Sequence, residues 1–170
     1  NSDPDTFEVL ENGYSKDKNS FYYLGKKAGN FKELNEHYSK DEHFVYYDFN
    51  KVNGADANTF KVLEKWYGKY KNNVYYGMSV FAVSDPENFV IVRCDGFINT
   101  CYTKDSKNVY YGSRTIENSD PASFQILTKG YSKDKNNVYF TDYHFSSDPQ
   151  NFEIIDCNSR MTCYAKDREN

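Results

Sequence analysis

Residues 120–140 read DPASFQILTKGYSKDKNNVYF, and residues 3–23 read DPDTFEVLENGYSKDKNSFYY. Self-similarity of this kind identifies a repeat architecture. The copies share three landmarks, a phenylalanine, a tyrosine and an aromatic pair, and in four copies an Asp-Pro corner precedes the phenylalanine. The phenylalanines are Phe7, Phe31, Phe60, Phe89, Phe124 and Phe152. The tyrosines are Tyr14, Tyr38, Tyr67, Tyr102, Tyr131 and Tyr164. The chain therefore contains about six copies of one short unit.

The repeat boundaries follow from these landmarks. They predict one repeat domain, 1–170, with repeats at approximately 2–27, 28–54, 55–83, 84–118, 119–146 and 147–170. The last repeat stops before its aromatic pair, and the chain begins inside a repeat. We therefore expect a trimmed mature region, from which a signal peptide could have been removed.

Each repeat is expected to form about three short antiparallel strands after a tight corner. Asp-Pro combines a good N-cap with a residue fixed near helical φ, which suits one helical turn or a type I turn. In the first repeat, 7–10, 13–16 and 21–23 have the β-branched and aromatic content of strands. About 28 residues bury too little apolar surface alone, so the repeats must stack. We predict an all-β, solenoid-like array, with a closed propeller-like ring as the alternative.

The turn and the aromatic pair resemble the repeat of the DKNYY family. The resemblance lies in residues 17–23, DKNSFYY, and in residues 134–140, DKNNVYF, and it recurs along nearly the whole chain. It implies the repeat architecture. Since the family has no established biochemical activity, the resemblance implies no site, cofactor or substrate.

An acidic residue follows the landmark tyrosine by three positions in most repeats. Short carboxylates accept hydrogen bonds from nearby backbone N–H groups and close hairpins, so we expect a structural role. The predicted turn residues are Asp17, Asp41, Asp105 and Asp134. Tyr70 replaces the acid in the third repeat. Calcium is the alternative ligand, but lysines occupy intervening positions and the downstream acids of a calcium loop are missing. We therefore predict no metal and no cofactor.

The aromatic pairs admit two interpretations. They can form the core between stacked repeats, which we favour, or they can expose one ring per repeat as a stacking platform for sugars. The candidate binding aromatics are Tyr22, Tyr46, Tyr75, Tyr110 and Tyr139.

Four cysteines occur as two pairs in equivalent places of the fourth and sixth repeats. Each pair flanks a lengthened loop between the first two strands, which would bring the cysteines within disulfide reach. Repeat equivalence favours disulfides Cys94–Cys101 and Cys157–Cys163. Reduced cysteines or a zinc site are the alternatives, although the spacing is looser than in usual zinc knuckles. Disulfides indicate the periplasm, the cell surface or secretion.

Composition narrows the class of partner. The chain has 17 Tyr and 13 Phe, and 21 Lys+Arg are interspersed with 25 Asp+Glu. No basic stripe is present for nucleic acid, and no apolar run is long enough for membrane insertion by a helix. The histidines His37, His43 and His144 share no repeat position, and no catalytic motif appears. We predict no enzyme, but a cell-envelope module that binds protein or glycan; a structural spacer is the alternative.

Overall fold

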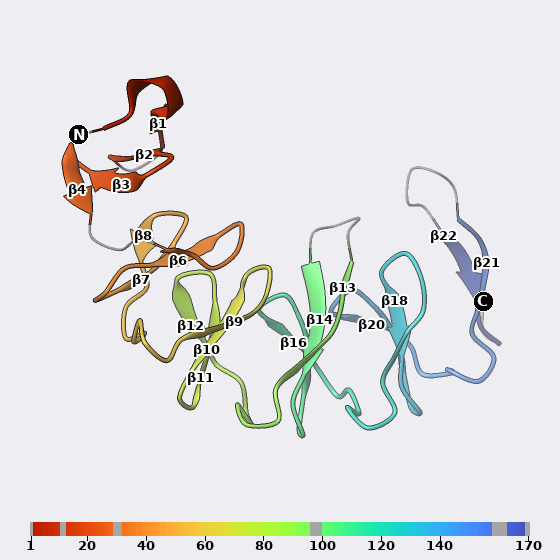
Figure 1. Ribbon diagram of the computed structural model, residues 1–170. Helices are drawn as coiled ribbons and strands as arrows, with labels where there is room; N and C mark the ends of the chain where they lie inside the picture. The colour runs from red at the N-terminus through yellow and green to blue at the C-terminus, as the bar shows by residue number, and fades with distance from the viewer. Residues whose placement is uncertain (1, 11–12, 29–31, 96–99, 158–162, 169–170) are drawn as a thin grey trace. The chain divides into compact units, whose positions relative to one another are not determined.

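The computed structural model describes residues 2–10, 13–28, 32–95, 100–157 and 163–168 (Figure 1). Apart from one turn of 3-10 helix, η1 (Pro4–Thr6), their regular elements are β-strands, which confirms the predicted all-β class. Within these residues no helix has the length and apolar character needed to cross a membrane. The chain forms two compact units, Asn1–Ala82 and Val83–Asn170, which divide it close to a predicted repeat boundary.

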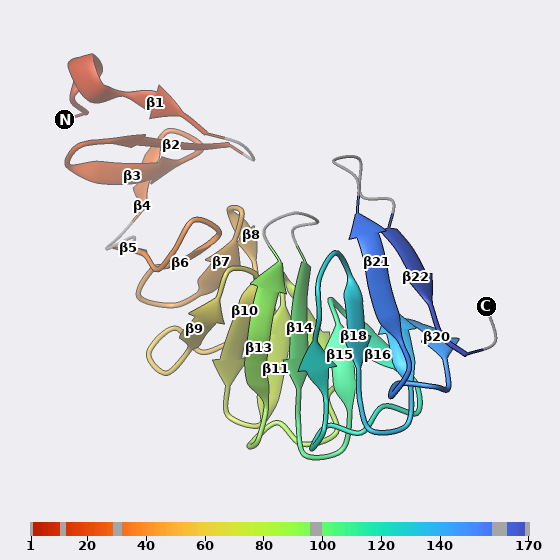
Figure 2. The same ribbon diagram turned by 90° about the vertical axis from the view of Figure 1, so that its right-hand side faces the viewer.

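The described strands form five four-stranded sheets and one two-stranded sheet, none of them closed into a barrel. Each is an antiparallel meander, in which every strand pairs with the next along the chain (Figure 2). We number these sheets first to sixth in chain order. Their first strands are β1 (Glu8–Val9), β5 (Lys32–Glu33), β9 (Lys61–Glu64), β13 (Val90–Asp95), β17 (Gln125–Ile126) and β21 (Glu153–Cys157). Their second strands are β2 (Tyr14–Asp17), β6 (Tyr38–Lys40), β10 (Tyr67–Tyr70), β14 (Thr100–Lys104), β18 (Tyr131–Lys133) and β22 (Cys163–Lys166).

The third strands carry the aromatic pairs, and the fourth strands were not predicted. The third strands are β3 (Ser20–Tyr23), β7 (Val45–Tyr47), β11 (Asn73–Tyr76), β15 (Val109–Tyr111) and β19 (Val138–Phe140). The fourth strands are β4 (Lys26–Ala28), β8 (Asn50–Lys51), β12 (Ser79–Phe81), β16 (Arg114–Ile116) and β20 (Tyr143–Ser146). The expected count of three strands per repeat was therefore wrong. The segment after the pair folds back and pairs with the third strand through its backbone, although the fourth strands have no common residue pattern.

Within each of the two units, a core cluster lies between two consecutive sheets. One cluster joins Tyr38, Val45 and Val52 of the second repeat to Phe60 and Tyr75 of the third. In the other unit, a second cluster joins the fourth and fifth repeats in the same way through Tyr102, Val109, Ile116, Phe124 and Tyr139. Stacking thus buries the side chains that a single sheet would expose, as predicted from repeat length.

In the third and fifth repeats the landmark phenylalanine fills the space between two sheets. The Phe60 ring lies 5.1 Å from Tyr38 of the preceding sheet and 5.7 Å from Tyr75 of its own sheet. Phe124 occupies the same position between Tyr102, at 5.7 Å, and Tyr139, at 6.4 Å. Phe31, the landmark of the second repeat, lies outside the described residues.

Candidate functional site

The repeated aspartate binds three parts of its repeat together. In the fifth sheet, Asp134 Oδ1 accepts the backbone N–H groups of Asn136 and Asn137 at 2.7 and 2.8 Å, which closes the β18–β19 turn. Its Oδ2 accepts the Tyr139 hydroxyl from β19 at 2.8 Å. The same Oδ2 accepts the Asp120 N–H at 2.7 Å, at the corner that opens the repeat. The sequence predicted the turn, but neither the tyrosine nor the corner.

Asp17 and Asp105 repeat this arrangement. Asp17 accepts from the Asp3 N–H at 2.7 Å, the Asn19 N–H at 2.7 Å and the Tyr22 hydroxyl at 2.8 Å. The Asp105 carboxylate accepts the Asp85 N–H at 3.0 Å and the Tyr110 hydroxyl at 2.7 Å. It also accepts the N–H groups of its own turn, from Lys107 and Asn108. Asp41 accepts from its turn, through His43 and Phe44, and from the Tyr46 hydroxyl at 2.6 Å.

The hydrogen bonds lower the pKa of Asp17 and of Asp105. The backbone N–H of Asp3 is the main cause that lowers the pKa of Asp17 to about 2. Burial of Asp105 raises the pKa of its carboxyl, but the Tyr110 hydroxyl and the backbone N–H groups outweigh burial, and the pKa lies below its ordinary value. Burial, followed by the hydrogen bond to Asp105, raises the pKa of Tyr110. At neutral pH the carboxylate is thus the acceptor and the phenol the donor.

The calcium alternative needs carboxylate oxygens that face a cation. Both oxygens of Asp105 and Asp134 instead accept N–H and O–H donors. No group of three or more His, Cys, Asp or Glu side chains in the described part of the chain could hold a metal ion.

The third repeat lacks this carboxylate. Tyr70 takes its place, pairs with Asn73 in the β10–β11 register, and packs against the core cluster. The equivalent of Tyr139 is Tyr75, whose side chain is 0% exposed and whose hydroxyl has no hydrogen-bond partner in the described structure. The hairpin therefore forms without the acid, but a buried donor remains unsatisfied.

The candidate binding aromatics are core residues. Tyr46, Tyr75, Tyr110 and Tyr139 are buried, with at most 9% of each exposed, and Tyr22 is half-buried with its hydroxyl on Asp17. Their burial fits the interpretation that we favoured, a core between stacked repeats, because they face the neighbouring sheet or the aspartate. The more exposed rings are second members of the pairs, such as Tyr23 and Phe140.

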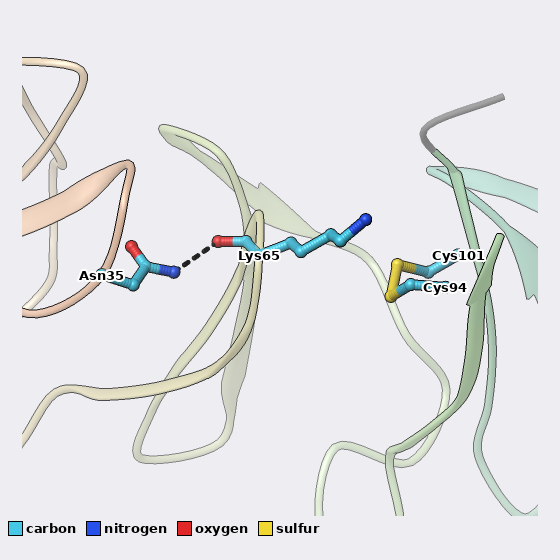
Figure 3. The surroundings of a disulfide bond; sticks show 4 residues. All are labelled: Asn35, Lys65, Cys94 and Cys101. Carbon is cyan, nitrogen blue, oxygen red and sulfur yellow. Dashed lines mark hydrogen bonds between the residues drawn. A yellow bond between two sulfur atoms is a disulfide. The ribbon is translucent and has the colours of Figure 1, made fainter. Parts of the chain in front are cut away.

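Three further kinds of hydrogen bond join consecutive repeats, and none was predicted. The lysine two residues after the landmark tyrosine donates to a backbone carbonyl in the next corner: Lys40 to Ala57 at 2.6 Å and Lys104 to Pro121 at 2.7 Å. The hydroxyl of the landmark tyrosine also donates to a backbone carbonyl of the next repeat, from Tyr102 to Gly130 at 2.8 Å. Asn35 donates to the Lys65 carbonyl at 2.8 Å, between the second and third sheets (Figure 3).

Cys94 and Cys101 form the predicted disulfide across β13 and β14, with Cα atoms 3.9 Å apart (Figure 3). The backbone register places Cys157 opposite Cys163 at the equivalent point of the sixth sheet. The Cys157 side chain and the loop 158–162 lie outside the described residues, so the second disulfide stays a prediction.

Two shallow hollows occupy equivalent positions in the first and fifth repeats. The first, with a volume of about 410 Å³, is lined by Thr6, Lys16, Asp17, Lys18, Phe21 and Glu33. The fifth, of about 320 Å³, is lined by Ser123, Gln125, Lys133, Asp134, Lys135, Pro149 and Gln150. Lys18 and Lys135 are equivalent residues, and each pairs with the aspartate of its corner, Asp3 or Asp120. Similar surface chemistry thus recurs with the repeat.

Comparison with known proteins gives one match. The model of the DKNYY family matches residues 25–79 and 102–170, which is more than half of the chain. No curated protein and no solved structure matches.

Proposed function

Because the chain belongs to the DKNYY family, whose repeat recurs along the sequence, we propose that it is a non-catalytic, exported or cell-envelope protein that binds protein or glycan through an extended surface. The observation that carries this proposal is the recurrence of equivalent hollows in the first and fifth repeats. Repeat proteins commonly bind extended ligands through surface features of this kind.

Two observations support the compartment and the mode of binding. The Cys94–Cys101 disulfide favours an oxidising location such as the periplasm, the cell surface or the medium. The repeated aspartates carry structural hydrogen bonds, which leaves the exposed side chains of the hollows for recognition. A structural spacer is the second candidate, and the pairing of Lys18 and Lys135 with neighbouring acids favours it.

The test is to alter equivalent hollows separately and together. Lys18→Gln and Lys135→Gln remove equivalent ammonium groups, each 62% exposed. On an array of envelope glycans and proteins, each variant should weaken binding by about twofold to fivefold, and the double variant by the product of the two factors. Lys61→Gln, outside both hollows, is the matched control and should bind like the unmodified chain. Loss of all binding in one single variant would indicate one unique site, and an unmodified chain that binds nothing would favour the spacer.

A further inference from the structure

One hollow in the unit Asn1–Ala82 departs from the repeated chemistry. It lies between the first and second sheets and has a volume of about 390 Å³. Its lining is Tyr14, Tyr23, Lys26, Lys27, Asp41, Phe44, Tyr46 and Lys51. This volume is at the lower end of the roughly 300–1,000 Å³ of small-molecule sites.

The aromatic and basic residues that distinguish this hollow lie at positions where the residue differs between repeats. Phe44 occupies the position of Ser20, Asn108 and Asn137 in other repeats, three residues after the turn aspartate. Lys27 and Lys51 lie opposite Tyr22 and Tyr46 in their sheets. The equivalent partners elsewhere are Val80, Thr115 and His144. The combination is therefore specific to this pair of sheets and is no consequence of the fold.

The hollow has an excess of positive charge. Lys26, Lys27 and Lys51 are exposed and take part in none of the ion pairs of the described residues. The one acid of the lining, Asp41, already accepts two backbone N–H groups and the Tyr46 hydroxyl. In the two repeated hollows, by contrast, Lys18 and Lys135 are neutralised by Asp3 and Asp120. Lys133, in the fifth-repeat hollow, is in no ion pair but donates to the Pro149 carbonyl. Of these three hollows, the one between the first two sheets therefore places the most ammonium groups without an acidic partner around an incoming anion.

Two aromatic rings stand beside these lysines. Tyr23 is 46% and Phe44 is 39% exposed. Tyr23 packs on the buried Tyr14 with ring centroids 4.7 Å apart, which fixes its position. The Lys51 ammonium lies 3.4 Å from the centroid of the Phe44 ring. A fixed aromatic face accepts the apolar C–H face of a sugar ring, and an adjacent ammonium accepts an acidic substituent.

We propose that this hollow binds an acidic oligosaccharide, with a sugar ring against Tyr23 or Phe44 and its carboxylate among Lys26, Lys27 and Lys51. This inference rests on the proposed function and gives it a ligand class. The net charge of −4 opposes any long polyanion, so the local positive charge of this hollow suits a short acidic ligand.

The test measures dissociation constants by NMR titration of the whole chain with a hyaluronan tetrasaccharide, which carries carboxylates. The triple variant K26Q/K27Q/K51Q should bind this probe about tenfold more weakly. Phe44→Asn, which restores the residue of other repeats, should bind it about fivefold more weakly. The control K32Q/K61Q/K107Q makes the same charge change at exposed lysines outside the hollow and should bind normally.

Three other probes separate the contributions to binding. Neutral chitotetraose should bind more weakly than hyaluronan and should lose affinity in Phe44→Asn but not in the triple lysine variant. Inorganic phosphate or an oligothymidylate that binds as tightly as hyaluronan, with no effect of Phe44→Asn, would overturn the proposal in favour of simple anion or nucleic-acid binding. Equal weakening by the control variant would also overturn it. Envelope binding that depends on Lys18 and Lys135 but not on this hollow would leave the proposed function standing and refute the ligand class alone.

Discussion

The third and fifth repeats each form a four-stranded sheet of the same topology, but different interactions stabilise the two sheets. In the fifth, the Asp134 carboxylate connects the turn, the Tyr139 hydroxyl and the corner at Asp120. In the third, Tyr70 stands in place of the acid, and the hydroxyl of Tyr75 is buried without a partner. Both hairpins nevertheless keep an equivalent register: Ser132 pairs with Tyr139, and Gly68 pairs with Tyr75.

The difference separates what sets the strand pairing from what stabilises it. Since the third sheet keeps its register without the acid, the apolar faces of the strands specify the pairing. The third repeat compensates with aromatic packing, because the Phe60 ring lies over Gly68, where other repeats carry Ser15, Ser39, Thr103 or Ser132. The carboxylate is thus a stabilising device that one repeat replaces with closer packing.

The largest effect is expected from removing the Asp134 carboxylate of the fifth repeat. Asp134→Ala removes the acceptor of three backbone N–H groups and one hydroxyl, and Asp134 is only 4% exposed. We expect the free energy of unfolding to fall by about 2–4 kcal/mol, measured by urea denaturation. The exposed Asp5 is the control, and Asp5→Ala should change stability by less than about 0.5 kcal/mol. A loss for Asp134→Ala no larger than that of the control would show that packing alone holds the fifth sheet.

The next largest effect is expected from disturbing the packing of Phe60 on Gly68 in the third repeat. A Cβ atom on Gly68 would lie 2.1 Å from Phe60 Cζ, so Gly68→Ala forces the ring out of its place. Overpacking of this kind should lower the free energy of unfolding by about 1–3 kcal/mol. Ser132→Ala at the equivalent position of the fifth repeat should stay within about 0.5 kcal/mol, since the Ser132 hydroxyl has no partner in the described structure. In a Phe60→Leu background the cost of Gly68→Ala should decrease; an unchanged cost would contradict the contact with the ring.

The same comparison shows what the sequence could predict. Three strands in each of the first five repeats, the Asp134 turn and the Cys94–Cys101 pair all depend on residues near one another in the chain, whose local preferences are readable. The fourth strands were not predicted because backbone pairing holds them in place. Their side chains at equivalent positions are as different as those of Lys27, Val80 and His144. Periodicity carries no signal where the side chains do not determine the strand.

The candidate site was less predictable for a different reason. The aromatic pair Tyr139-Phe140 predicts one ring on each face of a strand, but it does not say which ring faces the neighbouring sheet. That choice depends on Asp134 and Phe124, which meet Tyr139 only after folding and stacking. The hollow beside Phe44 likewise combines two repeats, so departures from the repeat pattern were its only sequence signal. In a repeat protein such departures are a useful guide to function, because the residues shared by all repeats are needed to form the core and the turns.

The smallest effects are expected from removing the equivalent hydroxyl groups of Tyr75 and Tyr139. They compare the two repeats most directly. Tyr75→Phe removes a buried hydroxyl that has no partner, so we expect it to raise the free energy of unfolding by up to about 1 kcal/mol. Tyr139→Phe removes a hydroxyl that donates to the Asp134 carboxylate at 2.8 Å, and it should lower the same quantity by about 1–2 kcal/mol. The two substitutions delete the same atom at equivalent positions, so effects of residue size and strand preference cancel. Opposite signs in urea denaturation would establish that the missing acid leaves the third repeat with an unsatisfied donor. An equal loss from both would mean that a bound water satisfies Tyr75 in solution, and the third repeat would then be stabilised by hydrogen bonding as the fifth is.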